Sequence, residues 1–130
     1  MLRPKHNTQV YLYSGIVDMR KSIDGLAALV EQELDLSPMS EALFVFCNRK
    51  RDKIKLLYWE RNGFILWYKR LEKQRFNWLS ATDEVAIIVD GYQLNLLLDG
   101  LDTFNNKPHE TLSFSTCLLY TSPSPRDEVL

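Results

Sequence analysis

The sequence has little cysteine and no long apolar run, which argues against a disulfide-rich secreted protein and against a membrane-spanning protein. Cysteine occurs only at Cys47 and Cys117, which are too few and too far apart to indicate a disulfide framework. A reducing, cytoplasmic setting is therefore expected. No apolar run approaches the roughly 20 residues that a membrane helix needs, and no signal-peptide core follows the first five residues. We expect a cytoplasmic protein with no membrane partner.

The residue patterns of enzymes and metal proteins are also scarce. The two histidines, His6 and His109, lie in the flanks of the chain, away from any patterned carboxylate or nucleophile. The sequence shows neither the ligand spacing of a zinc site nor a glycine-rich phosphate loop. Cys47, within an apolar run, is more typical of a small buried hydrophobe than of a nucleophile. We therefore predict no catalytic residue, no metal site and no cofactor.

What is present is the composition of one globular domain. The chain has 130 residues, of which 45% are hydrophobic and 25% charged, and both fractions are ordinary for a folded domain. We expect residues 1–8 to form a flexible leader, residues 9–104 a single domain, and residues 105–116 a C-terminal extension.

Residues 117–130 differ from the rest because they show no apolar period, cap or turn pattern. Permitted codons for residues 117–127 can spell a sequence that resembles the mosaic-end adapter of transposase-based DNA library preparation. We therefore expect residues 117–130 to be a non-native, adapter-derived tail, with the native C-terminus missing. A natural tail rich in serine and proline is the alternative.

The apolar periods predict an α+β domain. One helix is expected with Asp18 as its N-cap and with an apolar stripe that ends before Ser37 and Pro38. A second helix follows a capping box formed by Asp90 and Gln93. Short β-prone runs predict strands at residues 9–13, 42–47, 54–59, 64–68, 76–79 and 85–89. Consecutive hairpins then favour a mainly antiparallel β-meander sheet with two helices packed on one face. Residues 69–79 alternatively form a helix.

Charge is distributed very unevenly along the chain. Residues 49–75 contain ten basic and three acidic residues, a net charge of +7, whereas residues 1–48 and 76–116 together carry −7. The total charge of −1 therefore hides a basic segment, and such a segment is typical of phosphate binding. The candidate contacts are Arg49, Lys50, Arg51, Lys53, Lys55, Lys69, Arg70, Lys73 and Arg75. A solvated hairpin end is the alternative interpretation.

A hairpin turn is predicted inside this segment at Asn62 and Gly63, as a type I′ turn. That turn pairs Lys55 with Arg70, and like charges directly opposite each other destabilise a sheet unless an anion lies there. On the same face Trp59 and Tyr68 become candidates for stacking on bases. The alternative is that the tryptophans Trp59, Trp67 and Trp78 belong to the core.

A second candidate anion site is formed by Arg20 and Lys21. They fall in the first turn of the predicted helix, where positive charge opposes the helix dipole and a bound anion is favoured. Local pairing of either residue with Asp24 is the alternative.

Several ordered motifs resemble one known family: YLYSG at 11–15, DMRKSIDGL at 18–26, LFVFCNRK at 43–50, KLLYWERNGF at 55–64, LWYKRLE at 66–72 and LLDGLD at 97–102. Over about residues 9–102 the chain resembles the TnpB-type, Orf2-like accessory protein of the insertion-sequence-66 family of bacterial transposable elements. Cys47 and Gln74 stand where the family is expected to have arginine and glycine. The resemblance implies a small, non-catalytic protein that is encoded beside a larger DDE-type transposase and acts with it.

The basic segment and the resemblance together predict a non-catalytic accessory protein for DNA transposition. We expect it to bind DNA at the ends of the element through the basic hairpin, alongside the transposase. The alternatives are a protein–protein adaptor that docks on the transposase without contacting DNA, and an independent small enzyme.

Overall fold

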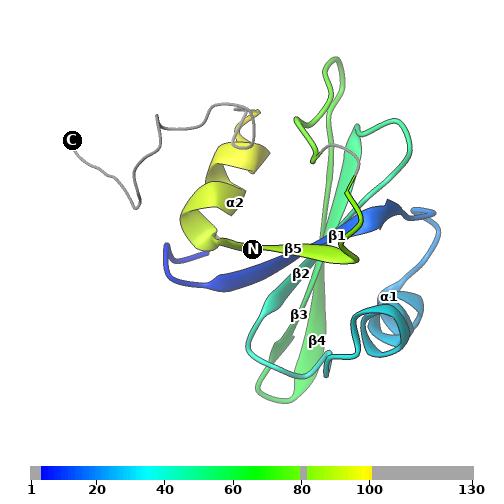
Figure 1. Ribbon diagram of the computed structural model, residues 1–130, viewed down its shortest axis with the longest axis vertical. Helices are drawn as coiled ribbons and strands as arrows, with labels where there is room; N and C mark the ends of the chain where they lie inside the picture. The colour runs from blue at the N-terminus through cyan, green and yellow to red at the C-terminus, as the bar shows by residue number, and fades with distance from the viewer. Residues whose placement is uncertain (1–3, 80–81, 101–130) are drawn as a thin grey trace.

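The computed structural model describes residues 4–79 and 82–100, and these form a sheet with helical segments on both sides (Figure 1). Within this part of the chain, none of the helices has the length and apolar character needed to cross a membrane. In chain order the elements are β1 (Gln9–Ile16), α1 (Ile23–Leu29), the π-helical η1 (Val30–Leu34), β2 (Leu43–Cys47), β3 (Lys53–Glu60), β4 (Gly63–Arg70), β5 (Ala86–Asp90) and α2 (Gly91–Leu98).

The five strands form one mixed sheet in the order β4-β3-β2-β1-β5. The pairs β4–β3, β3–β2 and β1–β5 are antiparallel, whereas β1 and β2 are parallel. Parallel neighbours need a crossover connection, and α1 with η1 supplies it. The predicted α+β class and the mainly antiparallel sheet are confirmed, but only β2, β3 and β4 form a meander.

The two helices lie on opposite faces of the sheet, so the prediction of both on one face is wrong. Successive strand residues point to opposite faces. Phe44 and Phe46 pack with Leu26 of α1, whereas Leu43 and Val45 pack with Leu94 of α2. Figure 1 shows α1 and α2 on either side of the sheet. The sheet therefore separates two cores, and every strand of the basic hairpin contributes to both.

The first helix starts later than predicted. Asp18 is not its N-cap, because its carboxylate instead accepts hydrogen bonds from Arg20. Ser22 occupies the N-cap position without a side-chain bond. The helical segment ends before Ser37, as predicted, with Asp35 in the left-handed region at φ 55°.

Of the other local predictions, one is wrong, one is confirmed, and the first strand is longer than predicted. β1 continues past residue 13 to Ile16, and the Ser14 amide donates to the Val85 carbonyl. Residues 76–79 form neither strand nor helix, although Phe76 is buried there. The capping box of α2 is present, with the Gln93 amide donating to the Asp90 carboxylate at 2.8 Å.

Residues 4–8 contact the start of α2. The Gly91 amide donates to the His6 carbonyl at 3.1 Å, and the Asn95 side chain donates to the Pro4 carbonyl at 3.2 Å. The predicted extension and adapter-derived tail, residues 105–116 and 117–130, lie outside the described residues.

Candidate nucleic-acid interface

The β3–β4 hairpin has a different register from the predicted one. Glu60 pairs with Gly63, so the turn residues are Arg61 and Asn62. Only Arg61 has a positive φ, 57°, whereas a type I′ turn needs two such residues. The predicted turn is therefore wrong, and the pairing is shifted by two residues. Lys55 lies opposite Tyr68 and not opposite Arg70.

A shift of two residues leaves each side chain on its predicted face, because the side-chain period of a strand is two. The like-charge pair also persists with another member, since Lys53 now lies opposite Arg70. Two cations therefore do face each other across the hairpin, as predicted, but the β3 member is Lys53 and not Lys55.

A tight turn presents the cations between β2 and β3. The Asn48 carboxamide oxygen accepts from the amides of Asp52 and Lys53, both at 3.1 Å, and its nitrogen donates to the Asp52 carboxylate at 2.8 Å. This last bond lowers the pKa of Asp52. Arg51 has φ 62°, and the exposed side chains of Arg49 and Lys50 lie at the tip of the turn.

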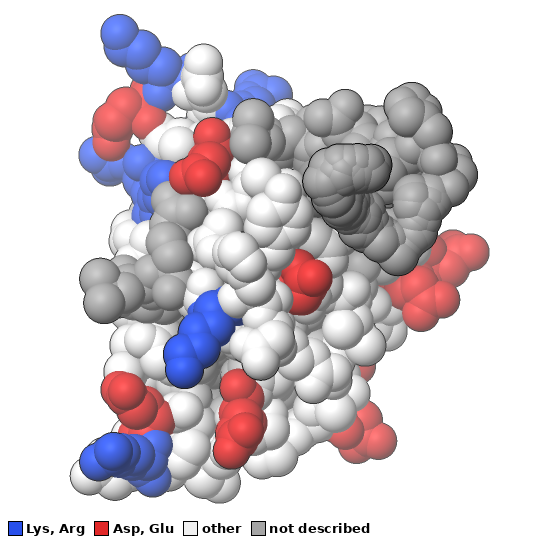
Figure 2. Space-filling view, turned by 90° about the vertical axis from the view of Figure 1, so that its left-hand side faces the viewer, with Lys and Arg blue, Asp and Glu red and all other residues white. Residues whose placement is uncertain are grey.

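The segment after β4 is fastened to that turn. The Leu71 amide donates to the Asp52 carbonyl at 2.8 Å, and the Phe76 amide donates to the Arg51 carbonyl at 2.7 Å. These bonds bring Lys73 and Arg75 close to the β2–β3 turn. We call the resulting cluster the basic end: Arg49, Lys50, Arg51, Lys53, Arg70, Lys73 and Arg75. Figure 2 shows Lys and Arg side chains gathered at the height where Figure 1 places these two loops.

Two carboxylates lie within the basic end and leave most of its charge unbalanced. Glu72 accepts from the Arg70 guanidinium at 3.0 Å, which raises the pKa of Arg70. Asp52 lies 3.7 Å from the Lys53 ammonium. Within residues 4–79 and 82–100, no ion pair involves the other five members.

Two of the predicted contacts, Lys55 and Lys69, are instead held by backbone carbonyls. The Lys55 ammonium donates to the carbonyls of Met19 and Lys21, at 2.7 and 2.8 Å. On the opposite face the Lys69 ammonium donates to the Leu98 carbonyl at 3.0 Å. That carbonyl belongs to the last turn of α2, where a cation is favoured by the helix dipole. Both lysines therefore connect the hairpin to other elements of the fold.

Arg20 and Lys21 precede α1 and do not lie in its first turn, so that prediction is wrong. The alternative partner Asp24 is wrong for Arg20 too, because Arg20 forms a bidentate pair with Asp18, the shortest contact being 2.7 Å. The hydrogen bond from the Arg20 side chain lowers the pKa of Asp18 to about 2. Arg20 is therefore neutralised locally, whereas Lys21 stays exposed beside the Lys55 ammonium.

The two candidates for stacking on bases, Trp59 and Tyr68, differ in how far their rings are exposed to solvent. Trp59 packs edge-to-face on Phe64, with ring centroids 5.0 Å apart, and is partly buried. Tyr68 is 49% exposed. Trp67 and Trp78 pack against the core on the α2 side, as the alternative interpretation predicted for the tryptophans.

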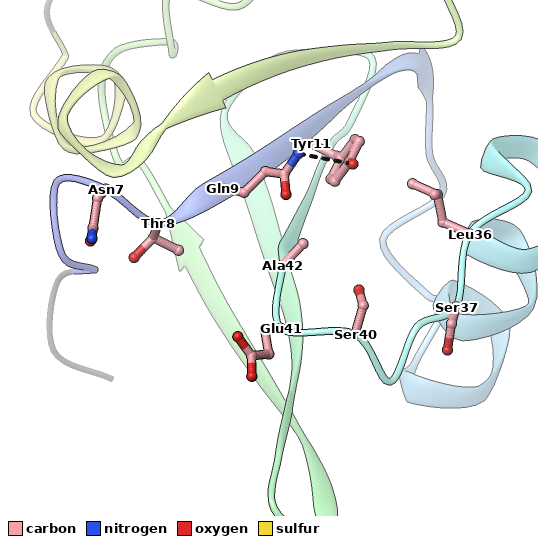
Figure 3. A pocket seen from close by; sticks show the side chains of 9 residues that line it. All are labelled: Asn7, Thr8, Gln9, Tyr11, Leu36, Ser37, Ser40, Glu41 and Ala42. Atoms are coloured by element: carbon pink, nitrogen blue, oxygen red, sulfur yellow. Dashed lines mark hydrogen bonds between the residues drawn. The ribbon is translucent and has the colours of Figure 1, made fainter.

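Elsewhere the described residues offer few features suited to chemistry. A cavity of about 460 Å³ lies between the start of β1 and the connection into β2 (Figure 3), and its only ionisable carboxylate is Glu41. No cation lines it, so it is unsuited to phosphate. Cys47 is 1% exposed, and burial raises its pKa to about 12. No group of three His, Cys, Asp or Glu in residues 4–79 and 82–100 is placed to hold a metal.

Sequence reasoning missed the residues that shape the basic end. Asn48 and the Phe76 amide carry no charge, yet they fix the two loops against each other. The signal available for Asn48 was its position directly after an apolar strand and before the cations, since asparagine side chains commonly bond the backbone of a following turn. No comparable signal marks Phe76, because its partner Arg51 lies in another loop.

Comparison with known proteins identifies relatives along most of the chain. A family model described as IS66 Orf2 like protein matches residues 8–108. Two uncharacterized proteins of Sinorhizobium fredii, y4hO and y4jC, are similar in sequence. The first is 37% identical over 111 residues, covering 85% of this chain and 94% of the relative. The second is 31% identical over 102 residues, covering 78% and 86%. No solved structure matches the chain significantly.

Proposed function

The chain belongs to the IS66 Orf2-like family, whose members are accessory to transposition, and we propose that it serves this role as a non-catalytic protein that binds DNA phosphates through the basic end. Its partners are then the ends of the element and the larger DDE-type transposase encoded with it. The members of the basic end are the proposed phosphate contacts, with Lys21 beside them.

The observation that carries this proposal is the unbalanced charge of the basic end. Lys53 and Arg70 face each other across β3 and β4, and each has one carboxylate nearby. The other five members form no ion pair within the described residues, and a bound anion would reduce the repulsion within the cluster. Asn48 and Phe76 hold two further groups of cations next to that pair. These hydrogen bonds hold cations close together although they repel one another, and a bound polyanion would offset that repulsion.

A salt titration of DNA binding tests the proposal. The full chain is mixed with labelled element-end duplex DNA, and its affinity is measured by gel shift between about 50 and 200 mM salt. If the cations contact phosphates, the logarithm of the affinity falls linearly with the logarithm of the salt concentration, with a slope of about −0.9 for each contact. Affinity that stays constant with salt would overturn the proposal.

A second candidate is an adaptor that docks on the transposase. It is favoured by apolar side chains that remain exposed near the β1–β5 side of the sheet, Ile16 at 60%, Ile88 at 59% and Val85 at 47%. This role predicts that the transposase co-purifies with the chain after nuclease treatment, and that Ile88→Glu reduces the recovery. Recovery that disappears on nuclease treatment would instead indicate that DNA links the two proteins.

A further inference from the structure

Tyr68 lies beside the basic end in a position suited to a nucleobase. We propose that Tyr68 stacks on an unpaired base, so that the preferred ligand of the basic end is single-stranded DNA and not intact duplex. This inference rests on the proposed function, because it specifies the class of DNA that the same surface binds.

The place of Tyr68 in the sheet leaves its ring accessible. β4 is the outermost strand on its side of the sheet, so no further strand in the described residues covers it. Tyr68 is 49% exposed, although it is a large aromatic residue within a regular strand. Exposed aromatic rings beside a cationic surface are what single-strand binding proteins use to stack bases.

The charges around Tyr68 are those that a phosphate backbone requires. Lys55 is its direct partner on β3, and the next pair on the same face is Lys53 with Arg70. Cross-strand neighbours and residues two apart on one face lie within reach of long side chains. A nucleotide stacked on the ring would therefore place its phosphate near Lys53 and Arg70.

The ring is also positioned before any ligand arrives. The Lys55 ammonium lies 5.3 Å from the ring centroid, in cation–π contact. The same ammonium is held by the carbonyls of Met19 and Lys21. Because this lysine cannot move freely, the tyrosine loses little conformational entropy on binding.

The need for an unpaired base follows from the geometry of duplex DNA. In a duplex the base faces are stacked on their neighbours, and only the base edges are presented in the grooves. A tyrosine face can contact a base face only where the strand is unpaired or the base is turned outward. Duplex contacts through the cations alone would leave the exposed ring without a base to stack on.

The test compares two forms of one oligonucleotide. Fluorescence anisotropy measures the affinity of the full chain for a labelled single strand and for the same strand annealed to its complement, at one salt concentration. We expect tighter binding of the single strand. Tyr68→Ala should weaken single-strand binding about tenfold, since stacking on one base is worth roughly that much or more. Tyr68→Phe should retain it.

A matched control is available on the other side of the sheet. Tyr92 of α2 is 51% exposed, so Tyr92→Ala removes a tyrosine of the same accessibility and should leave single-strand affinity unchanged. Melting temperatures confirm that each variant is folded. Tyr68→Ala should also keep the wild-type salt slope, because it removes no phosphate contact.

The outcomes separate this inference from the proposed function. Equal or tighter binding of the duplex, or equal affinities of Tyr68→Ala and Tyr92→Ala for the single strand, overturns the stacking inference alone. Binding of neither form by the wild-type chain overturns both. The comparison of the two DNA forms uses only wild-type protein, so it decides the question even if Tyr68→Ala does not fold.

Discussion

The two ends of the β3–β4 hairpin share the same strands but differ in charge. At the basic end, seven cations accompany Asp52 and Glu72. At the turn end, which we define as residues 60–63, Arg61 is accompanied by Glu60. The turn end is stabilised by the contact between Trp59 and Phe64. The hairpin turn therefore forms without a charge excess, so strand pairing does not require the excess at the basic end, which we propose serves DNA binding.

The largest expected effect comes from removing the aromatic residue that packs at each end of the hairpin, and the two ends should differ in the stability lost. Phe76 is 2% exposed in the core on the α2 side, and Phe76→Ala should lower the free energy of unfolding by about 3–5 kcal/mol. Phe64 is only partly buried, so Phe64→Ala should cost less, including about 0.5–1.5 kcal/mol for its contact with Trp59. Urea denaturation measures both, and equal losses would contradict the expected difference.

The second largest effect should come from removing exposed cations of the basic end. A variant with Arg49, Lys50, Lys73 and Arg75 replaced by glutamine should flatten the salt slope of DNA binding by about 3.6, since each of the four phosphate contacts contributes about 0.9. Its melting temperature should not fall, because these side chains form no ion pair in the described part of the chain. Arg61→Gln is the control at the turn end, and an equal loss there would show that the two ends bind alike.

A smaller effect separates cations that stabilise the fold from those that are exposed. Lys69→Met removes the cation that donates to the Leu98 carbonyl at the end of α2, and it should lower the free energy of unfolding by about 1–2 kcal/mol. Lys73→Met is the matched control, because Lys73 is exposed outside the strands and its loss should leave stability unchanged. Thermal unfolding of the two variants side by side measures the difference, and equal melting temperatures would refute it.

The smallest effect concerns one arginine at each end. Arg51 and Arg61 both occupy the left-handed region, with φ 62° and 57°, which a residue with a Cβ adopts at a cost. Replacing either with glycine should raise the free energy of unfolding by about 0.5–1 kcal/mol, after allowing for the entropy of glycine in the unfolded chain. Only Arg51→Gly should reduce the salt slope, by about one. Loss of stability in both variants would show that these side chains make contacts worth more than the backbone strain.

Local features of the fold could be predicted from the sequence. The apolar run at β2, the β-prone run at β5 and the capping box of α2 each depend on neighbouring residues, and each is present. The start of α1 was predicted wrongly because Asp18 had a competing partner. Its carboxylate accepts hydrogen bonds from the backbone and the side chain of Arg20, two residues away.

Long-range features could not be predicted in the same way. The parallel pairing of β1 with β2 depends on the crossover through α1. The apolar spacing of a helix shows that one side of it is buried, but not which face of the sheet it covers. Lys55 and Lys69 looked identical to the exposed cations in the sequence, yet their partners lie 34–36 and 29 residues away. The sequence alone showed that the segment is basic, but the fold was needed to separate the lysines that bond backbone carbonyls from the exposed cations.

The place of β1 in the sheet has a consequence for how the chain reaches its fold. Among the described strands β1 comes first in the chain, yet its outer neighbour β5 comes last, and Gln9 pairs with Asp90. Strands β2, β3 and β4 pair with neighbours in the sequence and close only short loops. The pairing of β1 with β5 instead joins segments far apart in the sequence, so it forms late. During synthesis β1 therefore has an open edge until residues 86–90 have left the ribosome, and open strand edges are sites of aggregation. A chain cut before residue 86 would lack β5 and would keep that edge of β1 open permanently. Protection of the first described strand therefore depends on the last one.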